Sequence, residues 1–229
     1  PDEAAVNVRD DLAEAYRLAW EHIARPGSWW TATQRVELAN TAIGAIRDVE
    51  PMPPWASVSA VEGRLPQGHV APAIAHDATY RIARHAGTIT EDLYHKVSDE
   101  IGPLRYVELV SIVTTVAART HFCRNIGIEL PPLPEPRPGD PTGAAPDELV
   151  QPQYNWVPVA APADQMAAVV QAYSGVPDEF DNLWRMSDAQ YMPEAEMIDP
   201  EWSRREGGLS RPQTELVAAR VAQLRECFY

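Results

Sequence analysis

The sequence predicts an all-α protein, and three observations support this. Apolar residues recur at intervals of three and four along most of the chain, which places them on one face of a helix. Capping residues begin several of these stretches, and glycine or proline ends them. Segments in which apolar and polar residues alternate, as they do in half-buried strands, are almost absent. Because 45% of the 229 residues are hydrophobic, the helices have ample apolar material to bury.

The first predicted helix covers residues 10–23, with Asp10 or Asp11 as its N-cap. Its buried face is expected to consist of Leu12, Tyr16, Ala19 and Ile23. The second predicted helix begins at Thr31 and Gln34, which have the spacing of a capping box. Its buried stripe is expected to consist of Val36, Ala39, Ile43 and Ile46.

The next two predicted helices adjoin each other. Thr90 caps the first of them, and Gly102 followed by proline ends it. Its inward face is expected to contain Leu93, Val97 and Ile101. The stretch 104–126 is apolar nearly all round and ends at Gly127, so it is predicted to be the central helix of a bundle.

A proline-rich segment follows the central helix. Ten of the 22 prolines lie between residues 131 and 162. Proline fixes φ and lacks a backbone donor, so an extended connector is predicted there. Helical patterning resumes over 163–173, and Ser210 and Gln213 open a final helix with a second capping box. The expected units are a helical domain over 1–130, the connector over 131–162 and an incomplete helical unit over 163–229.

The charge and cysteine content restrict the partners. The formal net charge of −14 repels phosphate backbones and anionic lipids, so neither a nucleic acid nor a membrane is expected as a partner. The longest apolar stretch, 106–118, is too short to span a bilayer. The acidic N-terminal sequence lacks the apolar run of a signal peptide. Two cysteines far apart give no disulfide framework, so a cytoplasmic location is expected.

Sequence motifs for metal or cofactor binding are absent. The six histidines form no HExxH motif and no i, i+4 pair, and the two cysteines form no CxxC. The chain also lacks GxSxG and a glycine-rich phosphate loop. We therefore expect neither a metal nor a cofactor.

The C-terminal stretch TELVAARVAQLRECFY resembles the carboxymuconolactone decarboxylase and alkylhydroperoxidase D superfamily. In redox members of that family a glutamate is followed after twelve positions by a cysteine, then by a second cysteine and a histidine. Glu215 and Cys227 match the first two places, and the other two would be positions 230 and 234, beyond the 229 residues. RPGSWWTATQRVELA, YRIARHAGTITEDLY and YVELVSIVTTVAARTHFCRNIGIELPPLP also look like two-part members of this family.

The resemblance implies a duplicated helical bundle of the alkylhydroperoxidase D type, and it implies oligomers. It also implies a thiol peroxidase in which Cys227 and Glu215 are catalytic, acting on a small-molecule peroxide with a dithiol reductant. Counting the family spacing from Glu37 or from Glu108 gives no cysteine pair. The first domain is therefore interpreted as a degenerate copy that retains the helical bundle without the redox cysteines. Where the family often has Asn-Gly before the first cysteine, this chain has Arg225-Glu226.

Other interpretations remain open at this point. One is a non-catalytic helical assembly protein, because the apolar residues of the last helix favour association, at least into a homodimer. A less favoured one is a carboxymuconolactone decarboxylase-like lyase, which needs a general acid rather than a thiol pair. Cys123 is expected to be a buried structural residue. Glu108 is expected to be buried and paired with an arginine such as Arg105 or Arg119.

Overall fold

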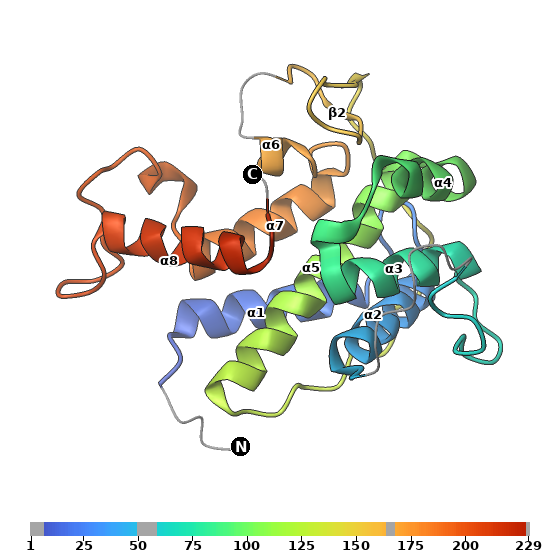
Figure 1. Cartoon of the computed structure of the whole chain (residues 1–229), viewed down its shortest axis with the longest axis horizontal. Coiled ribbons are helices and arrows are strands. Elements are labelled where there is room, and N and C mark those ends of the chain that lie inside the picture. The colour runs from blue at the N-terminus through green and yellow to red at the C-terminus, as the bar shows by residue number, and fades with distance from the viewer. Residues whose placement is uncertain (1–6, 50–58, 164–167, 228–229) are drawn as a thin grey trace.

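The computed structural model describes residues 7–49, 59–163 and 168–227. Within these ranges the protein is mostly helical, with eight α-helices, two short 3-10 helices and one very small sheet. The predicted all-α class is confirmed at this level (Figure 1).

Five helices form the main body. They are α1 (Asp10–Ile23), α2 (Ala32–Arg47), α3 (Ala73–His85), α4 (Glu91–Ile101) and α5 (Pro103–Ile126). The long helix α5 packs against the other four, so the prediction that it is central is confirmed (Figure 1). The core that these helices enclose is dense in small and branched side chains, among them Leu38, Ala42, Leu109, Ile112 and Val116.

The predicted caps are correct for three helices and wrong for α1. The N-cap of α1 is Arg9, which makes no side-chain capping bond. The Arg9 guanidinium instead donates to Asp11 and to the carbonyl oxygen of Ala189. Asp10 and Asp11 lie in the first turn, where the helix dipole favours negative charge. The capping boxes of α2 and α8 and the Thr90 cap of α4 form as predicted.

The buried face of α2 is rotated from the predicted stripe. Ala39 is fully buried, but the other three members of the stripe are only half-buried against the core. Leu38, Ala42 and Ala45 are buried instead. Helix α2 packs against both α3 and α5, so the residues that it buries are those that face these two helices and not a single stripe.

Gly102 forms the corner between α4 and α5. Its φ of 90° is accessible mainly to glycine, and it lets the two helices meet at a bend of 112°. Gly127 ends α5 in the left-handed conformation, as predicted. Among the described residues, no single helix is both long and apolar enough to cross a bilayer, and α4 and α5 meet that test only as a bent pair.

Two helices were missed from the sequence. In α3 the polar side chains of His76, Asp77 and Arg81 are buried alongside small alanines, which removes the apolar periodicity. A 3-10 turn, η1 (Ala86–Thr88), follows it. In α7 (Pro177–Gln190) the buried residues include the polar Glu179 and Asn182, so the apolar periodicity of a helix is lost there as well.

The connector lies along the turn between α1 and α2. Backbone N–H groups of Arg137, Thr142 and Gly143 donate to carbonyl oxygens in residues 24–28 at 2.8–3.1 Å, and the Trp20 indole donates to the Pro132 carbonyl. It also contains one feature that we did not predict. Strands β1 (Leu149–Val150) and β2 (Val159–Ala160) form a very small antiparallel pair, so the backbone is extended here as predicted, and only the pairing was missed.

The remaining elements follow the connector. They are α6 (Ala168–Gln171), α7, η2 (Glu194–Glu196) and α8 (Arg211–Leu224). Of the helix predicted over 163–173 the structure gives only the four-residue α6, and residues 164–167 lie outside the described ranges. Helix α7 packs against α1 and α5. Helix α8 has no buried residue and extends away from the α2–α4 side of the molecule (Figure 1).

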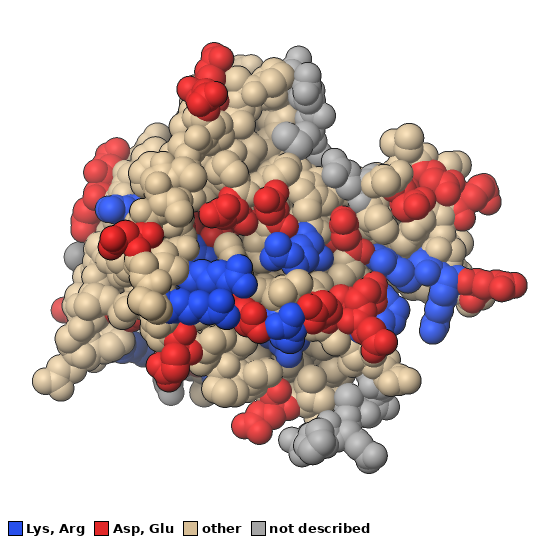
Figure 2. Space-filling view, turned by 180° about the vertical axis from the view of Figure 1, so that it is seen from behind, with Lys and Arg blue, Asp and Glu red and all other residues tan. Residues whose placement is uncertain are grey.

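Charged residues of both signs lie side by side on the surface. On the face shown in Figure 2, basic side chains gather in a band in which acidic ones are interspersed. Such mixing cancels much of the local field of the arginines, which is unlike the single-sign basic stripe of a nucleic-acid-binding surface.

Candidate functional site

The turn at the end of α8 determines where Cys227 lies. The Cys227 N–H donates to the Ala222 carbonyl at 3.0 Å, and the Glu226 N–H donates to the Gln223 carbonyl at 3.2 Å. These are the two bonds of a Schellman motif, which requires a left-handed residue after the cap. Glu226 takes that place with a φ of 54°, the conformation that a glycine there would adopt more readily. The chain therefore reverses without the Asn-Gly pair that is frequent in the resembled family.

Cys227 is exposed and lines a groove of about 740 Å³. The wall opposite is formed by η1 and the residues around it, and the floor is largely apolar, with Ile82, Ile89 and Val110. Gly87 allows the close approach, because a Cβ at this position would lie 3.2 Å from the Arg225 carbonyl oxygen. The groove thus brings the C-terminal turn against the end of α3.

A second hollow of about 360 Å³ adjoins this groove. The two share Tyr106, Val110 and Trp156 in their walls. The second hollow is lined mainly by aromatic rings, among them Tyr94, Tyr154 and Tyr173. Trp156, which comes from the connector, stacks on Tyr94 with ring centroids 6.1 Å apart. Together the two hollows form an aromatic surface that leads to the thiol.

Glu215 lies in the first part of α8, far from Cys227. The nine helical steps from Glu215 to Leu224 rise by roughly 14 Å along the helix axis, so the structure does not bring the two predicted site residues together. The Glu215 carboxylate accepts hydrogen bonds from the Tyr191 hydroxyl at 2.5 Å and from Arg211 Nε at 2.7 Å. The bond from Tyr191 and the charge of Arg211 lower the pKa of Glu215, which keeps it ionised.

Cys123 is buried in α5, as expected. Burial raises the pKa of its thiol, so the reactive thiolate is disfavoured there. It lines a different hollow, formed with the C-terminal end of α2, so the structure does not bring it next to Cys227. Of the two cysteines, Cys227 is the one that solvent reaches.

A buried ionic cluster joins three helices. Arg35 of α2 lies between the carboxylates of Glu108 in α5 and Glu179 in α7, and all three side chains are at most 1% exposed. Arg35 Nη1 donates to Glu108 and, at 2.7 Å, to Glu179 Oε1. The prediction that Glu108 pairs with an arginine is confirmed, but the partner is Arg35 and not Arg105 or Arg119.

Further hydrogen bonds complete the cluster. The Trp29 N–H donates to Glu108 Oε2 at 2.7 Å, and the Ser111 hydroxyl donates to Glu179 Oε2 at 2.5 Å. His22 Nε2 lies 2.9 Å from Glu179 Oε1. Single-sequence reasoning missed this arrangement because its members are 73 and 144 positions apart.

The pKa values of the two carboxyl groups of the cluster are shifted in opposite directions. Burial raises the pKa of Glu108, and the nearby charge of Glu179 raises it further. Burial opposes ionisation of Glu179 as well, but Arg35 and His22 outweigh it and hold the pKa of Glu179 below its ordinary value. Within this cluster, ionisation of Glu179 is thus favoured over ionisation of Glu108.

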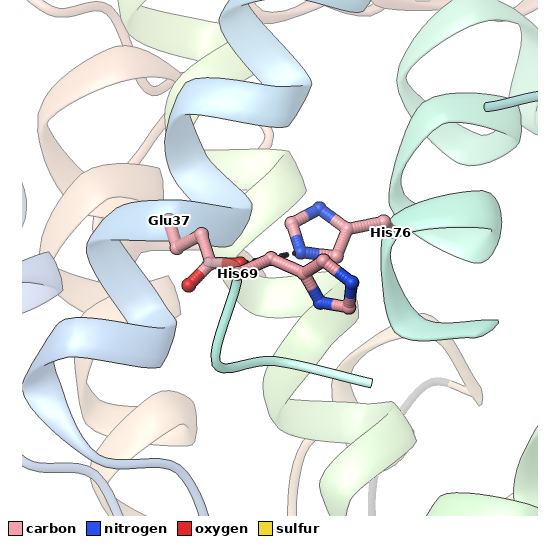
Figure 3. A group of neighbouring side chains, drawn as sticks. All are labelled: Glu37, His69 and His76. Atoms are coloured by element: carbon pink, nitrogen blue, oxygen red, sulfur yellow. Dashed lines mark hydrogen bonds and ion pairs between the residues drawn. The ribbon is translucent and has the colours of Figure 1, made fainter. Parts of the chain in front are cut away.

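A third group of side chains meets between α2 and α3. Glu37, His69 and His76 each have a potential ligand atom within 4.8 Å of the others (Figure 3). His76 is buried, Glu37 is half-buried and His69 is exposed. The sequence search for metal motifs missed this group because His69 belongs to the loop before α3 and Glu37 to another helix.

Comparisons with protein-family models, with curated proteins and with solved structures found no match to this chain. The resemblance to the alkylhydroperoxidase D superfamily therefore depends on the quoted residues alone.

Proposed function

We propose that the protein is a thiol peroxidase of the alkylhydroperoxidase D-like type, with Cys227 as the reacting group and an apolar organic hydroperoxide as its substrate. A duplicated helical bundle and a reducing, cytoplasmic setting belong to the same proposal. The observation that carries it is the position of Cys227, a solvent-accessible thiol in a largely apolar groove that adjoins an aromatic hollow. The mostly helical fold and the family spacing from Glu215 to Cys227 agree with it.

The reaction forms one bond and breaks one. The Cys227 thiolate attacks the terminal peroxide oxygen, an S–O bond forms as the O–O bond breaks, and the departing alkoxide takes a proton from water. Cys227 is left as a sulfenic acid. A dithiol reductant then condenses with it, releasing water and giving a mixed disulfide, and its second thiol restores Cys227.

The groove supports an organic substrate. Trp156, Tyr106 and their neighbours offer apolar surface that hydrogen peroxide cannot use but that an aromatic hydroperoxide can cover. Glu215 supports the peroxidase less directly, because it lies at the other end of α8. Its lowered pKa also makes it a poor general acid, which favours thiol chemistry over a lyase.

Fully reduced protein without added reductant is expected to consume one equivalent of cumene hydroperoxide per chain. We expect the rate constant to exceed that of free cysteine by at least about tenfold, because the groove positions the substrate. Stopped-flow kinetics and trapping of the sulfenic acid measure both quantities. Cys227→Ser should abolish the reaction, and Cys123→Ser should leave it unchanged.

Trp156→Ala provides the matched test of substrate class. It should slow the reaction with cumene hydroperoxide and leave the slower reaction with hydrogen peroxide nearly unchanged. A wild-type protein that reacts no faster than free cysteine would contradict the proposal.

The exposed apolar face of α8 favours a second candidate, a helical assembly protein. Leu216 is 71% exposed, and its neighbours on the same side of the helix are more than half exposed: Val217, Val221 and Leu224. Among the described elements, none packs extensively against α8. Such a face would be covered in a homodimer.

Light scattering at micromolar concentration is expected to give at least a dimer. Leu216→Glu combined with Val221→Glu should shift it to the monomer mass, because each carboxylate would be buried without a partner. Ile198→Glu, at an exposed apolar residue outside α8, is the control and should leave the mass unchanged. A monomer mass for the wild-type chain would count against assembly.

A further inference from the structure

The residues Glu37, His69 and His76 have the donor set of a transition-metal site. Glu37 lies on α2, His76 lies on α3, and His69 lies in the loop just before α3 (Figure 3). Two imidazoles and one carboxylate are ligands that zinc takes in catalytic sites, where a fourth position is left for water. One potential ligand atom from each residue lies within 4.8 Å of the other two. An ion bound at about 2.1 Å from each ligand fits between atoms at such distances after small side-chain shifts.

Hydrogen bonds to the rest of the protein hold the ligands in place. The carboxylate oxygens of Glu37 accept the Val70 N–H at 2.9 and 3.2 Å, which anchors the loop that carries His69. His69 Nδ1 donates to the Ala71 carbonyl at 2.9 Å, so the neutral ring carries its lone pair on Nε2. Outer bonds of this kind orient metal ligands in proteins.

His76 and Glu37 already lie in contact. His76 Nε2 is 2.7 Å from Glu37 Oε1, and His76 Nδ1 is 2.8 Å from the Thr41 hydroxyl, whose oxygen is 3.2 Å from the Glu37 carbonyl oxygen. When that hydroxyl donates to the carbonyl and accepts from Nδ1, Nε2 carries the lone pair that an ion can bind.

His76 is fully buried, so packing holds its ring in this position. A divalent ion between His76 and Glu37 attracts the carboxylate and the ring nitrogen at once and needs no protonated ring.

We propose that Glu37, His69 and His76 bind one Zn²⁺ ion, with a further coordination position open to solvent on the side of the exposed His69. The ion ties the loop before α3 to α2. Its ligands are separate from the residues that line the Cys227 groove, so this proposal does not depend on the peroxidase.

Calorimetric titration of the chelator-treated full chain with zinc chloride tests the proposal. The expected result is saturable binding of one ion per chain. Co²⁺ used in place of zinc should give the visible absorption of a site with four or five ligands. His69→Gln should weaken binding by at least about tenfold. This variant changes an exposed loop residue, and circular dichroism checks that it remains folded.

Two controls locate the ion. His95→Gln removes an exposed histidine that lies 3.6 Å from Glu91, outside the cluster, and should leave the affinity unchanged. Cys227→Ser tests a different location for the ion, the groove in which Cys227 lies beside Glu226, the partner of His85. This variant should also leave the affinity unchanged. The proposal is overturned by the absence of saturable binding, by equal affinity in His69→Gln, or by loss of binding in Cys227→Ser.

Discussion

Replacing Arg35 with methionine is expected to lower the free energy of unfolding by about 3–5 kcal/mol, as measured by urea denaturation. The side chain is 1% exposed and lies between two buried carboxyl groups. Methionine fills a similar volume but leaves Glu179 ionised and uncompensated, or forces it to take up a proton. The penalty is therefore electrostatic and exceeds the loss of ordinary hydrogen bonds.

The exposed Arg47 on the same helix provides the control. Arg47→Met removes one positive charge from the C-terminal turn of α2 and is expected to change the free energy of unfolding by less than about 1 kcal/mol. Equal effects of the two substitutions would show that the cluster contributes no more than a surface charge.

The two glutamates should respond differently to neutral replacement. The pKa of Glu108 is raised and that of Glu179 is lowered, so Glu108→Gln should cost less than Glu179→Gln. The pH dependence has a definite sign. The pKa of Glu179 is lowered from 4.5, so its contribution is present above about pH 4.5 and is lost as the pH falls. The pKa of Glu108 is raised from 4.5, so its contribution has the opposite sign and is lost as the pH rises. Glu179→Gln should therefore lose less stability in acid than the wild type.

Gly27→Ala is expected to lower the free energy of unfolding by about 3 kcal/mol, which is at the upper end for overpacking. A Cβ at position 27 would overlap Glu108 Oε1 and lie 2.5 Å from Arg35 Nη1. Although these atoms belong to side chains, their hydrogen bonds hold them in place, so neither can move without breaking the cluster. Chemical denaturation measures the effect.

A control substitution at a second glycine and a double mutant test whether the loss of stability comes from the clash with Glu108. Gly44→Ala places a methyl group on the exposed side of α2, where nothing lies within 4 Å, and should stabilise the protein by up to about 1 kcal/mol. In a Glu108→Ala background, Gly27→Ala should cost at least about 1 kcal/mol less than in the wild type. The same cost in both backgrounds would mean that the clash is not with Glu108.

The sequence predicted those parts of the fold that local chemistry determines. The capping boxes at Thr31 and Ser210, the cap at Thr90 and the helix ends at Gly102 and Gly127 each depend on a few neighbouring residues. The missed helices α3 and α7 bury polar side chains whose partners lie elsewhere in the chain. Their buried faces therefore lack the apolar spacing by which a helix is found.

The candidate sites were less accessible to sequence reasoning. Cys227 was found because a family spacing includes it, but the groove beside it is completed by Trp156 of the connector and by Gly87, which no spacing links to it. Glu37, His69 and His76 come from two helices and a loop, so no linear motif contains them. Distances of this kind are set by how α2 and α3 pack.

The position of Glu179 also affects how the protein can be made. During synthesis from the N-terminus, Arg35 and Glu108 emerge long before Glu179, the ionised carboxylate to which Arg35 is paired in the finished fold. Until α7 leaves the ribosome, Arg35 has only one of its two carboxylate partners, Glu108. We therefore expect the nascent chain to complete this cluster late, when α7 packs against α1 and α5.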